Sequence, residues 1–146
     1  MKHVEVGLDG ARTGYVEIAG EGTPLVLLHG LGAASAPYYA ATVASPALAG
    51  RHAFLVDLLG FGTSDRPTSF SYSLADQADA VARALAALGL SAVDLVAHSM
   101  SGGIAVSSLT AGPTSPGGWC SSSRAWNRRR VPAWTGSPRR SSSAAA

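Results

Sequence analysis

The sequence predicts an α/β fold with a mostly parallel sheet and flanking helices. The first observation is a series of short apolar runs at residues 24–28, 52–57 and 92–97, which are typical of strands buried on both faces. The second observation is that helical patterns at residues 36–49 and 74–88 separate these runs. Because strands that alternate with helices form right-handed βαβ units, the three strands are expected to lie parallel in one sheet.

The segment before the first apolar run predicts a hairpin. Residues 4–18 alternate in the manner of two short strands, and the dipeptide Asp9-Gly10 marks the turn between them. A second turn is expected at residues 20–22, a Gly-Glu-Gly sequence. The chain is therefore expected to enter the first parallel strand at residue 24.

The helix at residues 74–88 has the clearest boundaries. Ser73 is suited to cap its N-terminus, and Asp76 lies in the first turn, where the helix dipole favours a negative charge. Gly89 is suited to end it. The preceding residues 58–73 are rich in glycine, serine, threonine and proline and are predicted to form a loop.

The other two helices are predicted from composition. The helix at residues 36–49 is rich in alanine and is expected to end at Gly50. After the third apolar run, small residues lead into a further helix that includes residues 104–106. Each helix thus follows a strand, as βαβ units require.

Length and composition limit the class of protein. The 146 residues are enough for one domain, and no apolar run reaches the ~18 residues that a membrane span needs. The first six residues lack the apolar segment of a secretory signal. Cys120 is the only cysteine, so neither an internal disulfide nor a Cys-rich zinc site is possible. We therefore expect a cytoplasmic protein without a metal or a membrane partner.

The charge divides the chain into two parts. Residues 1–111 hold five basic and nine acidic residues, a net charge of −4, and are predicted to form the domain. Residues 112–146 hold six arginines and no acid, a net charge of +6, together with all three tryptophans. This second part is a low-complexity Arg/Ser/Pro/Trp segment and is expected to be disordered.

The most specific motif is Ala-His-Ser-Met-Ser-Gly-Gly at residues 97–103, between a buried strand and a helix start. A nucleophilic serine at such a place sits on a sharp, strained turn, which needs small residues two positions before and after it. Ala97 and Ser101 are small, although the commoner pattern is G-x-S-x-G. Ser99 is thus the candidate nucleophile. The alternative is a strand-to-helix turn of small residues without a catalytic role.

Two further segments strengthen the catalytic interpretation. A His-Gly turn lies at residues 27–32, and residues 57–67 follow the pattern D-x-x-G-x-G-x-S-x-x-P. With the serine motif, they resemble the α/β-hydrolase superfamily over about residues 4–110. The resemblance implies that this part is a partial α/β-hydrolase fold whose C-terminal strands are missing.

The resemblance also implies roles for site residues. Ser99 would be the nucleophile, and the backbone N–H groups of Leu31 and Met100 would form the oxyanion hole. The residues that support this site would be His29, Gly30, His98 and Gly102. The resemblance further implies that the protein needs no cofactor and that its substrate is a small molecule.

The resemblance leaves several branches of the family open. A serine nucleophile argues against haloalkane dehalogenases and epoxide hydrolases, which place aspartate there. Esterases, lipases, C–C hydrolases, peptidases and acyltransferases remain candidates.

The catalytic triad is incomplete in this chain. The family order is nucleophile, acid and then histidine, but no Asp, Glu or His follows Ser99. We therefore expect a truncated domain with little or no turnover, in which the edge of the strand at 92–97 is unpaired. A non-enzymatic scaffold that binds a ligand or a partner chain is the alternative function.

Residues 112–146 allow two interpretations. A shifted reading frame of back-translated codons permits a helix exit, a turn and a buried strand, which favours a reading frame lost near Ala111. A genuine basic segment is the alternative, and it would bind nucleic acid in a salt-dependent way. We favour the lost frame and expect no nucleic-acid partner. The basic residues concerned are Arg124, Arg128, Arg129, Arg130, Arg139 and Arg140.

Overall fold

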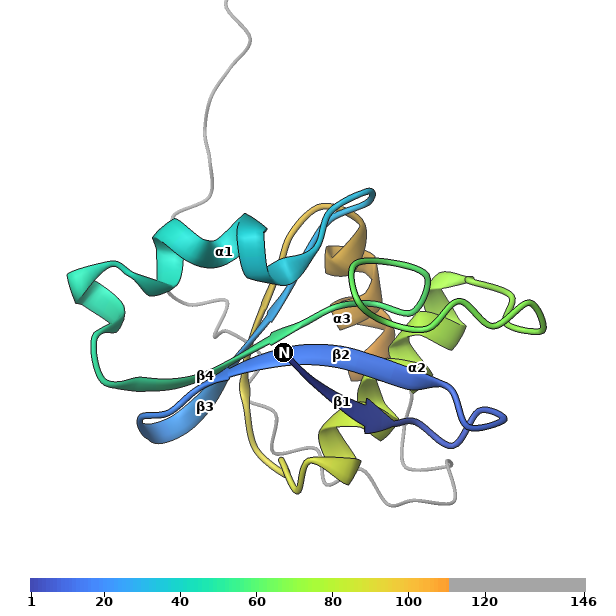
Figure 1. The fold of residues 1–146 in the computed structure, drawn as a ribbon, viewed down its shortest axis with the longest axis horizontal. Coiled ribbons are helices and arrows are strands. Elements are labelled where there is room, and N and C mark those ends of the chain that lie inside the picture. Colours follow the sequence, from blue (N-terminus) through green and yellow to red (C-terminus); the bar gives the residue numbers. More distant parts are fainter. Residues whose placement is uncertain (111–146) are drawn as a thin grey trace, which may run out of the picture.

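A computed structural model describes residues 1–110 of the chain, with side chains described through residue 106. It contains one five-stranded sheet in the order β1-β2-β4-β3-β5 (Figure 1). The strands are β1 (Lys2–Glu5), β2 (Arg12–Ile18), β3 (Glu21–Leu28), β4 (Arg51–Val56) and β5 (Asp94–Ala97). The helices are α1 (Ser35–Val43), α2 (Leu74–Ala87) and α3 (Met100–Thr110), with a short 3₁₀ helix η1 (Pro46–Leu48). The segment expected to be disordered, 112–146, lies outside the described residues.

The sheet confirms the predicted α/β fold class. Strand β3 pairs in parallel with β4 on one side and with β5 on the other. The predicted hairpin adds β1 and β2, which pair antiparallel with each other, and β2 continues antiparallel onto β4. The carboxyl ends of β3, β4 and β5 therefore meet at one edge of the sheet, where ligand sites of such sheets form.

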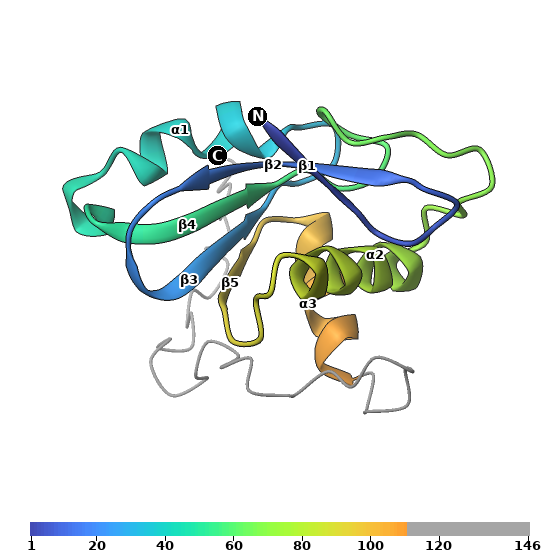
Figure 2. The same ribbon diagram turned by 60° about the horizontal axis from the view of Figure 1, so that its bottom comes forward.

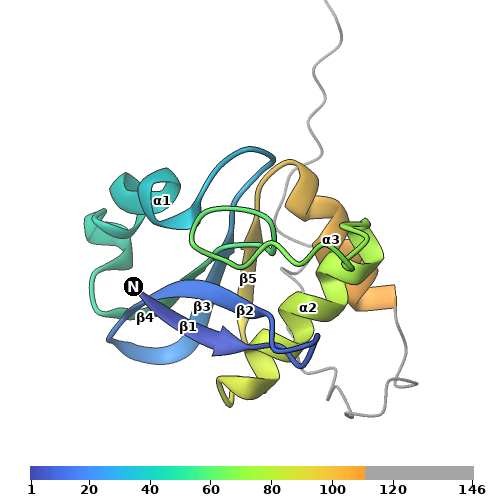
Figure 3. The same ribbon diagram turned by 45° about the vertical axis from the view of Figure 1, so that its right-hand side comes forward.

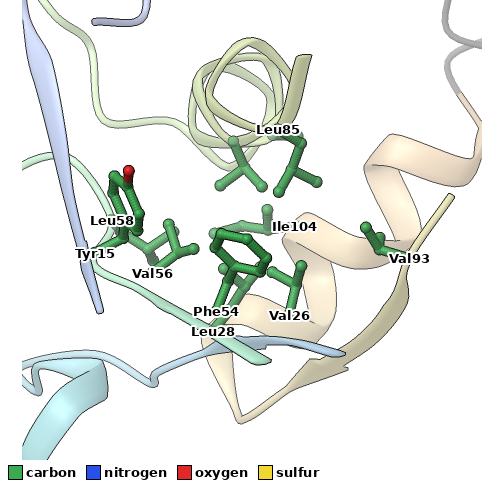
Figure 4. Packing of buried hydrophobic residues seen from close by; sticks show 11 residues of the cluster. Tyr15, Val26, Leu28, Phe54, Val56, Leu58, Leu85, Val93 and Ile104 are labelled. Carbon is green, nitrogen blue, oxygen red and sulfur yellow. The ribbon is translucent and has the colours of Figure 1, made fainter. Parts of the chain in front are cut away.

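Helices cover both faces of the sheet, as Figure 2 shows. On one face, Tyr39 of α1 packs with Leu25, Leu27 and Leu55. On the other face, α2 and α3 lie side by side (Figure 3) and close a larger core. Figure 4 shows this core, whose labelled side chains are Tyr15, Val26, Leu28, Phe54, Val56, Leu58, Leu85, Val93 and Ile104. Side chains alternate between the two faces of the sheet and both faces are covered, which explains why residues 25–28 of β3 and 53–56 of β4 are apolar without interruption.

The helix predicted at residues 36–49 is shorter than expected. Helix α1 ends at Val43, and the 3₁₀ helix η1 replaces its predicted last turn. The cause is Pro46, because the residue before a proline avoids helical backbone angles. Ser45 accordingly has φ −65° and ψ 137°, an extended conformation.

Two strand predictions also need correction. The strand predicted as buried at 92–97 begins at Asp94, and Val96 is 42% exposed because β5 forms one edge of the described sheet. The turn predicted at 20–22 is partly strand, since β3 begins at Glu21 with an irregular register before Leu25.

The boundaries of α2 confirm the prediction from sequence. The Ser73 side chain accepts a hydrogen bond from the Asp76 amide, and Gly89 follows the helix with a left-handed φ of 72°. Helix α3 contains the predicted residues 104–106. None of the helices within residues 1–110 has the length and apolar character needed to cross a bilayer.

Candidate active site

The two predicted motifs meet because β3 and β5 are neighbours. Leu28 at the end of β3 is in register with Ala97 at the end of β5. The chain continues from these positions into the β3–α1 and β5–α3 loops, which lie side by side in Figures 1 and 3. The His98 N–H donates to the Leu28 carbonyl at 3.1 Å, extending the pairing into the loops. The parallel sheet therefore brings residues 29–32 beside residues 98–101.

Ser99 occupies a strained turn. Its φ is 55°, a left-handed conformation that few residues other than glycine adopt and that costs about 1–3 kcal/mol. The turn is closed by hydrogen bonds from the Ser101 N–H to the His98 carbonyl at 3.1 Å and from the Gly102 N–H to the Ser99 carbonyl at 2.9 Å. Ser99 is exposed at the sheet edge. We call this strand-to-helix turn, residues 97–102, the elbow.

Gly30 lets the β3–α1 loop approach the elbow closely. A Cβ at this position would lie 2.7 Å from Nδ1 of His98 and 3.3 Å from Cβ of Ser99. By contrast, a Cβ at Gly102 would meet no described atom within 4 Å. Of the two predicted supporting glycines, Gly30 is therefore the one that needs to be small.

His29 is fully buried and both of its ring nitrogens have partners. Nε2 accepts a hydrogen bond from the Leu58 N–H at 3.1 Å. This bond assigns the proton to Nδ1, which donates to the Gly30 carbonyl at 2.7 Å. The ring therefore ties its own turn to the loop after β4, which leaves it no free nitrogen for proton transfer.

These bonds set the direction of the Leu31 amide. The Gly30 carbonyl accepts from His29 Nδ1 and from the Ala33 N–H at 3.3 Å. Since C=O and N–H point in opposite directions across a trans peptide, the Leu31 N–H points away from the His29 ring. Met100 begins α3, where N–H groups have no partner within the helix. Neither amide donates a hydrogen bond to another group within residues 1–110.

Ser101 links the two loops directly. Its side chain is completely buried, and Oγ donates to the His29 carbonyl at 2.5 Å. Sequence reasoning identified Ser101 only as a small residue at a place where glycine is commoner. One indication of a hydrogen bond at this position was present in the sequence, the hydroxyl of Ser101, because a buried hydroxyl group needs a partner.

The His98 side chain packs against α1. Its ring lies against that of Tyr38 on α1, with centroids 5.1 Å apart. Among the described side chains, no hydrogen bond joins His98 to Ser99. The structure therefore places the His98 ring beside Gly30 and Tyr38.

Asp57 is a buried carboxylate that sequence reasoning did not place in the site. It follows β4 and accepts hydrogen bonds from the Ser35 N–H at 2.7 Å and from the Thr63 N–H at 2.9 Å. A third bond comes from the Thr63 hydroxyl at 3.1 Å. Ala34 provides no side-chain cap for α1, so Asp57 supplies the missing acceptor. A Cβ at Gly62 would overlap this carboxylate, which explains the glycine there.

Tyr39 supports the end of β3 from the α1 side. Its hydroxyl donates to the Leu28 carbonyl at 2.9 Å, the same carbonyl that accepts from the His98 N–H. Burial raises the pKa of Tyr39 because it disfavours the phenolate. The neutral hydroxyl thus remains a donor at the point where β3 enters its loop.

No described group of side chains resembles a metal site. Within residues 1–110, no three His, Cys, Asp or Glu side chains lie together in a way that would hold a metal ion.

Comparison with known proteins gives consistent matches. A 2-hydroxymuconate semialdehyde hydrolase of Pseudomonas putida is 35% identical over 105 residues, which are 70% of this chain and 37% of that protein. An esterase from Exiguobacterium antarcticum superposes with a TM-score of 0.68 at 29% identity, covering 79% of this chain and 42% of that one. A bacterial membrane phospholipase A gives a TM-score of 0.66 at 33% identity, covering 77% and 35%.

The chain thus spans only 37% of the length of its Pseudomonas putida relative. The sequence profile of the alpha/beta hydrolase fold matches residues 23–109, more than half of the chain. This range includes the His-Gly turn, the loop after β4 and the elbow. The chain belongs to the α/β-hydrolase fold family.

Proposed function

We propose that this chain carries the nucleophile and oxyanion hole of a hydrolase that cleaves an ester, amide, lactone or related bond in a small molecule. Ser99 is the nucleophile, and the N–H groups of Leu31 and Met100 hold the oxyanion. The single observation that carries the proposal is the left-handed Ser99, packed beside Gly30 with two unpaired amides nearby. No cofactor is needed for this chemistry, and no nucleic acid or membrane partner is part of the proposal.

The reaction begins when Ser99 Oγ bonds to a carbonyl carbon and the C=O electron pair moves onto oxygen. Two backbone N–H groups aimed at that oxygen stabilise its charge in the transition state. Collapse of the intermediate expels an alcohol or amine and leaves an acyl-serine, which water then hydrolyses. The N-terminus of α3, with its partial positive charge, adds to the stabilisation.

A serine nucleophile limits the kinds of bond that the hydrolase is proposed to cleave. Serine forms an acyl intermediate from carbonyl compounds, whereas branches of the family that open epoxides or displace halide use aspartate at the elbow. The relatives named above include an esterase and a 2-hydroxymuconate semialdehyde hydrolase. Cleavage next to a carbonyl is therefore the proposed chemistry.

Turnover by this chain is proposed to be slow. The proton of Ser99 has to pass to a base, and the sequence holds no Asp, Glu or His after Ser99. Two buried groups that precede Ser99 could in principle accept a proton, His29 and Asp57. Both nitrogens of His29 and both carboxylate oxygens of Asp57 already have hydrogen-bond partners. An oxyanion hole without a base retains only weak catalysis.

An alkyl fluorophosphonate tests the role of Ser99, because it bonds to a nucleophilic serine with loss of fluoride. We expect one adduct in the intact mass of the full chain, mapped to Ser99 and absent in Ser99→Ala. The labelling rate should be slower than that of a full-length relative by on the order of 10³-fold or more. Equal labelling of Ser99→Ala would overturn the assignment, and labelling as fast as the relative would overturn the proposed inactivity.

The same sample tests the alternative of a binding scaffold. Saturable binding of a small ligand by the folded chain, with no adduct at Ser99 over many hours, would favour that alternative.

A further inference from the structure

We infer that Ser101 is a positioning residue that clamps the turn carrying the Leu31 amide against the nucleophile elbow. This inference rests on the proposed oxyanion hole. The inference goes beyond the oxyanion hole by assigning a role to the hydroxyl of Ser101, a residue that stands where the G-x-S-x-G pattern has glycine. The starting observation is the buried hydrogen bond from Ser101 Oγ to the His29 carbonyl at 2.5 Å.

The turn itself has no need of this hydroxyl. The left-handed Ser99 is closed by backbone bonds from the amides of Ser101 and Gly102. A glycine at 101 would keep both of these bonds and satisfy the steric demand for a small residue. A serine in a first helical turn can instead bond to nearby carbonyls of its own segment. The Ser101 hydroxyl reaches across to another loop, which indicates that its role concerns that loop.

The acceptor of this bond is well placed to control the oxyanion hole. The His29 carbonyl belongs to the peptide that precedes Gly30, and the next peptide is held through its own oxygen by His29 Nδ1. Two consecutive peptides are therefore fixed at their oxygens. Because each peptide is planar, fixing both leaves the Leu31 N–H little freedom to turn.

The donor of this bond is equally well placed. Ser101 directly follows Met100, whose N–H is the other proposed oxyanion donor. The hydroxyl therefore joins the two segments that carry the two donors and sets the distance between them. The other described links near these segments are the backbone bond from His98 to Leu28 and the ring contact between His98 and Tyr38.

Amide hydrogen exchange of the full chain tests the clamp without depending on activity. The reporter within residues 30–33 is the Ala33 amide, which donates to the Gly30 carbonyl. In Ser101→Ala and Ser101→Gly, its exchange is expected to accelerate roughly 5- to 10-fold, the factor that one lost hydrogen bond gives. Exchange in β3 and β4 should stay unchanged.

Ser64→Ala is the matched control. Ser64 is also buried, and its hydroxyl also donates to a backbone carbonyl, that of Asp57 at 2.7 Å. Its removal should lower the melting temperature without accelerating exchange at residues 30–33. This control separates faster exchange in the turn of Ser101→Ala from a general loss of stability.

The outcomes separate the clamp from the proposed function. Unchanged exchange at residues 30–33, or acceleration spread evenly over the sheet, would overturn the clamp. So would failure of both Ser101→Ala and Ser101→Gly to fold, because the hydroxyl would then serve the whole fold. If fluorophosphonate labels Ser99, the rate should fall about as much as exchange rises. If it labels no serine, the proposed function fails while the exchange result still decides the clamp.

Discussion

At the scale of single residues, the site depends on how closely two loops can approach. Gly30 shows this dependence, since a Cβ there would press on both His98 and Ser99. The His98 ring is exposed and can yield, but Cβ of Ser99 is fixed by a strained turn. A side chain at residue 30 is therefore expected to displace the β3–α1 loop rather than to unfold the protein.

Gly30→Ala is predicted to slow fluorophosphonate labelling of Ser99 by roughly 10-fold or more, because shifts well under 1 Å already weaken catalytic geometry. The labelling rate and the melting temperature are to be measured together. Gly20→Ala is the control, since a Cβ at Gly20 crowds the backbone of Arg51 at the opposite end of the sheet. It should lower the melting temperature and leave labelling of the folded protein unchanged. Unchanged labelling in Gly30→Ala together with slower labelling in Gly20→Ala would contradict the prediction.

The residue scale also shows what sequence reasoning missed. It predicted the strained turn at Ser99 because such a turn needs small residues on either side. The His-Gly turn was identified only through the family resemblance. Sequence reasoning did not predict the hydrogen bonds from Ser101 to His29 and from Ser35 to Asp57, because these join segments far apart in the chain. Only the register of β3 beside β5 and β4 brings those segments together.

At the scale of elements, the loop after β4 is held to β2 by an ion pair. Asp65 accepts hydrogen bonds from the Arg12 amide at 2.9 Å and from Arg12 Nε at 3.2 Å. The backbone bond from the Asp65 N–H to the Arg12 carbonyl at 2.9 Å adds to this attachment. The Arg12 side chain and amide lower the pKa of Asp65 below its usual value.

Acid is therefore predicted to loosen this attachment. A carboxylate with a lowered pKa in the folded state stabilises the protein above its unfolded pKa of about 4, and this stabilisation is lost as the pH falls through the folded pKa. The melting temperature of Asp65→Asn should fall less steeply than that of the unmodified chain below about pH 4. Arg12→Ala should flatten the same part of the curve. Parallel curves for all three proteins would contradict the assignment.

Elements were predictable where local signals agreed. The Ser73 cap and Gly89 defined α2 to within one residue, because capping is decided by neighbouring residues. The prediction for α1 overlooked Pro46, whose effect on Ser45 is equally local and was available in the sequence. The edge position of β5 was expected only from the family resemblance, since apolar residues alone do not show whether a strand is central or at an edge.

At the scale of the whole molecule, the described sheet has unequal edges. At one edge β1 is short and follows an exposed N-terminal residue, with Lys2 paired to Glu17 at 2.7 Å. At the other edge β5 presents Val96, which is 42% exposed, and pairs only with β3 among the described strands. The charge on β5 is confined to its first residue, Asp94, which forms an ion pair with Arg51 at 2.8 Å. An edge strand whose other residues are apolar favours pairing with another chain.

Val96→Lys is accordingly predicted to reduce self-association, because a charged side chain on an edge strand opposes intermolecular pairing. Light scattering over a range of concentrations measures the effect, and Val96→Thr is the control that keeps the β-branched shape without a charge. Both variants should cost less than about 1 kcal/mol of stability at this exposed strand position. Equal association by Val96→Lys and the unmodified chain would show that β5 is covered in solution, and that association arises elsewhere on the molecule.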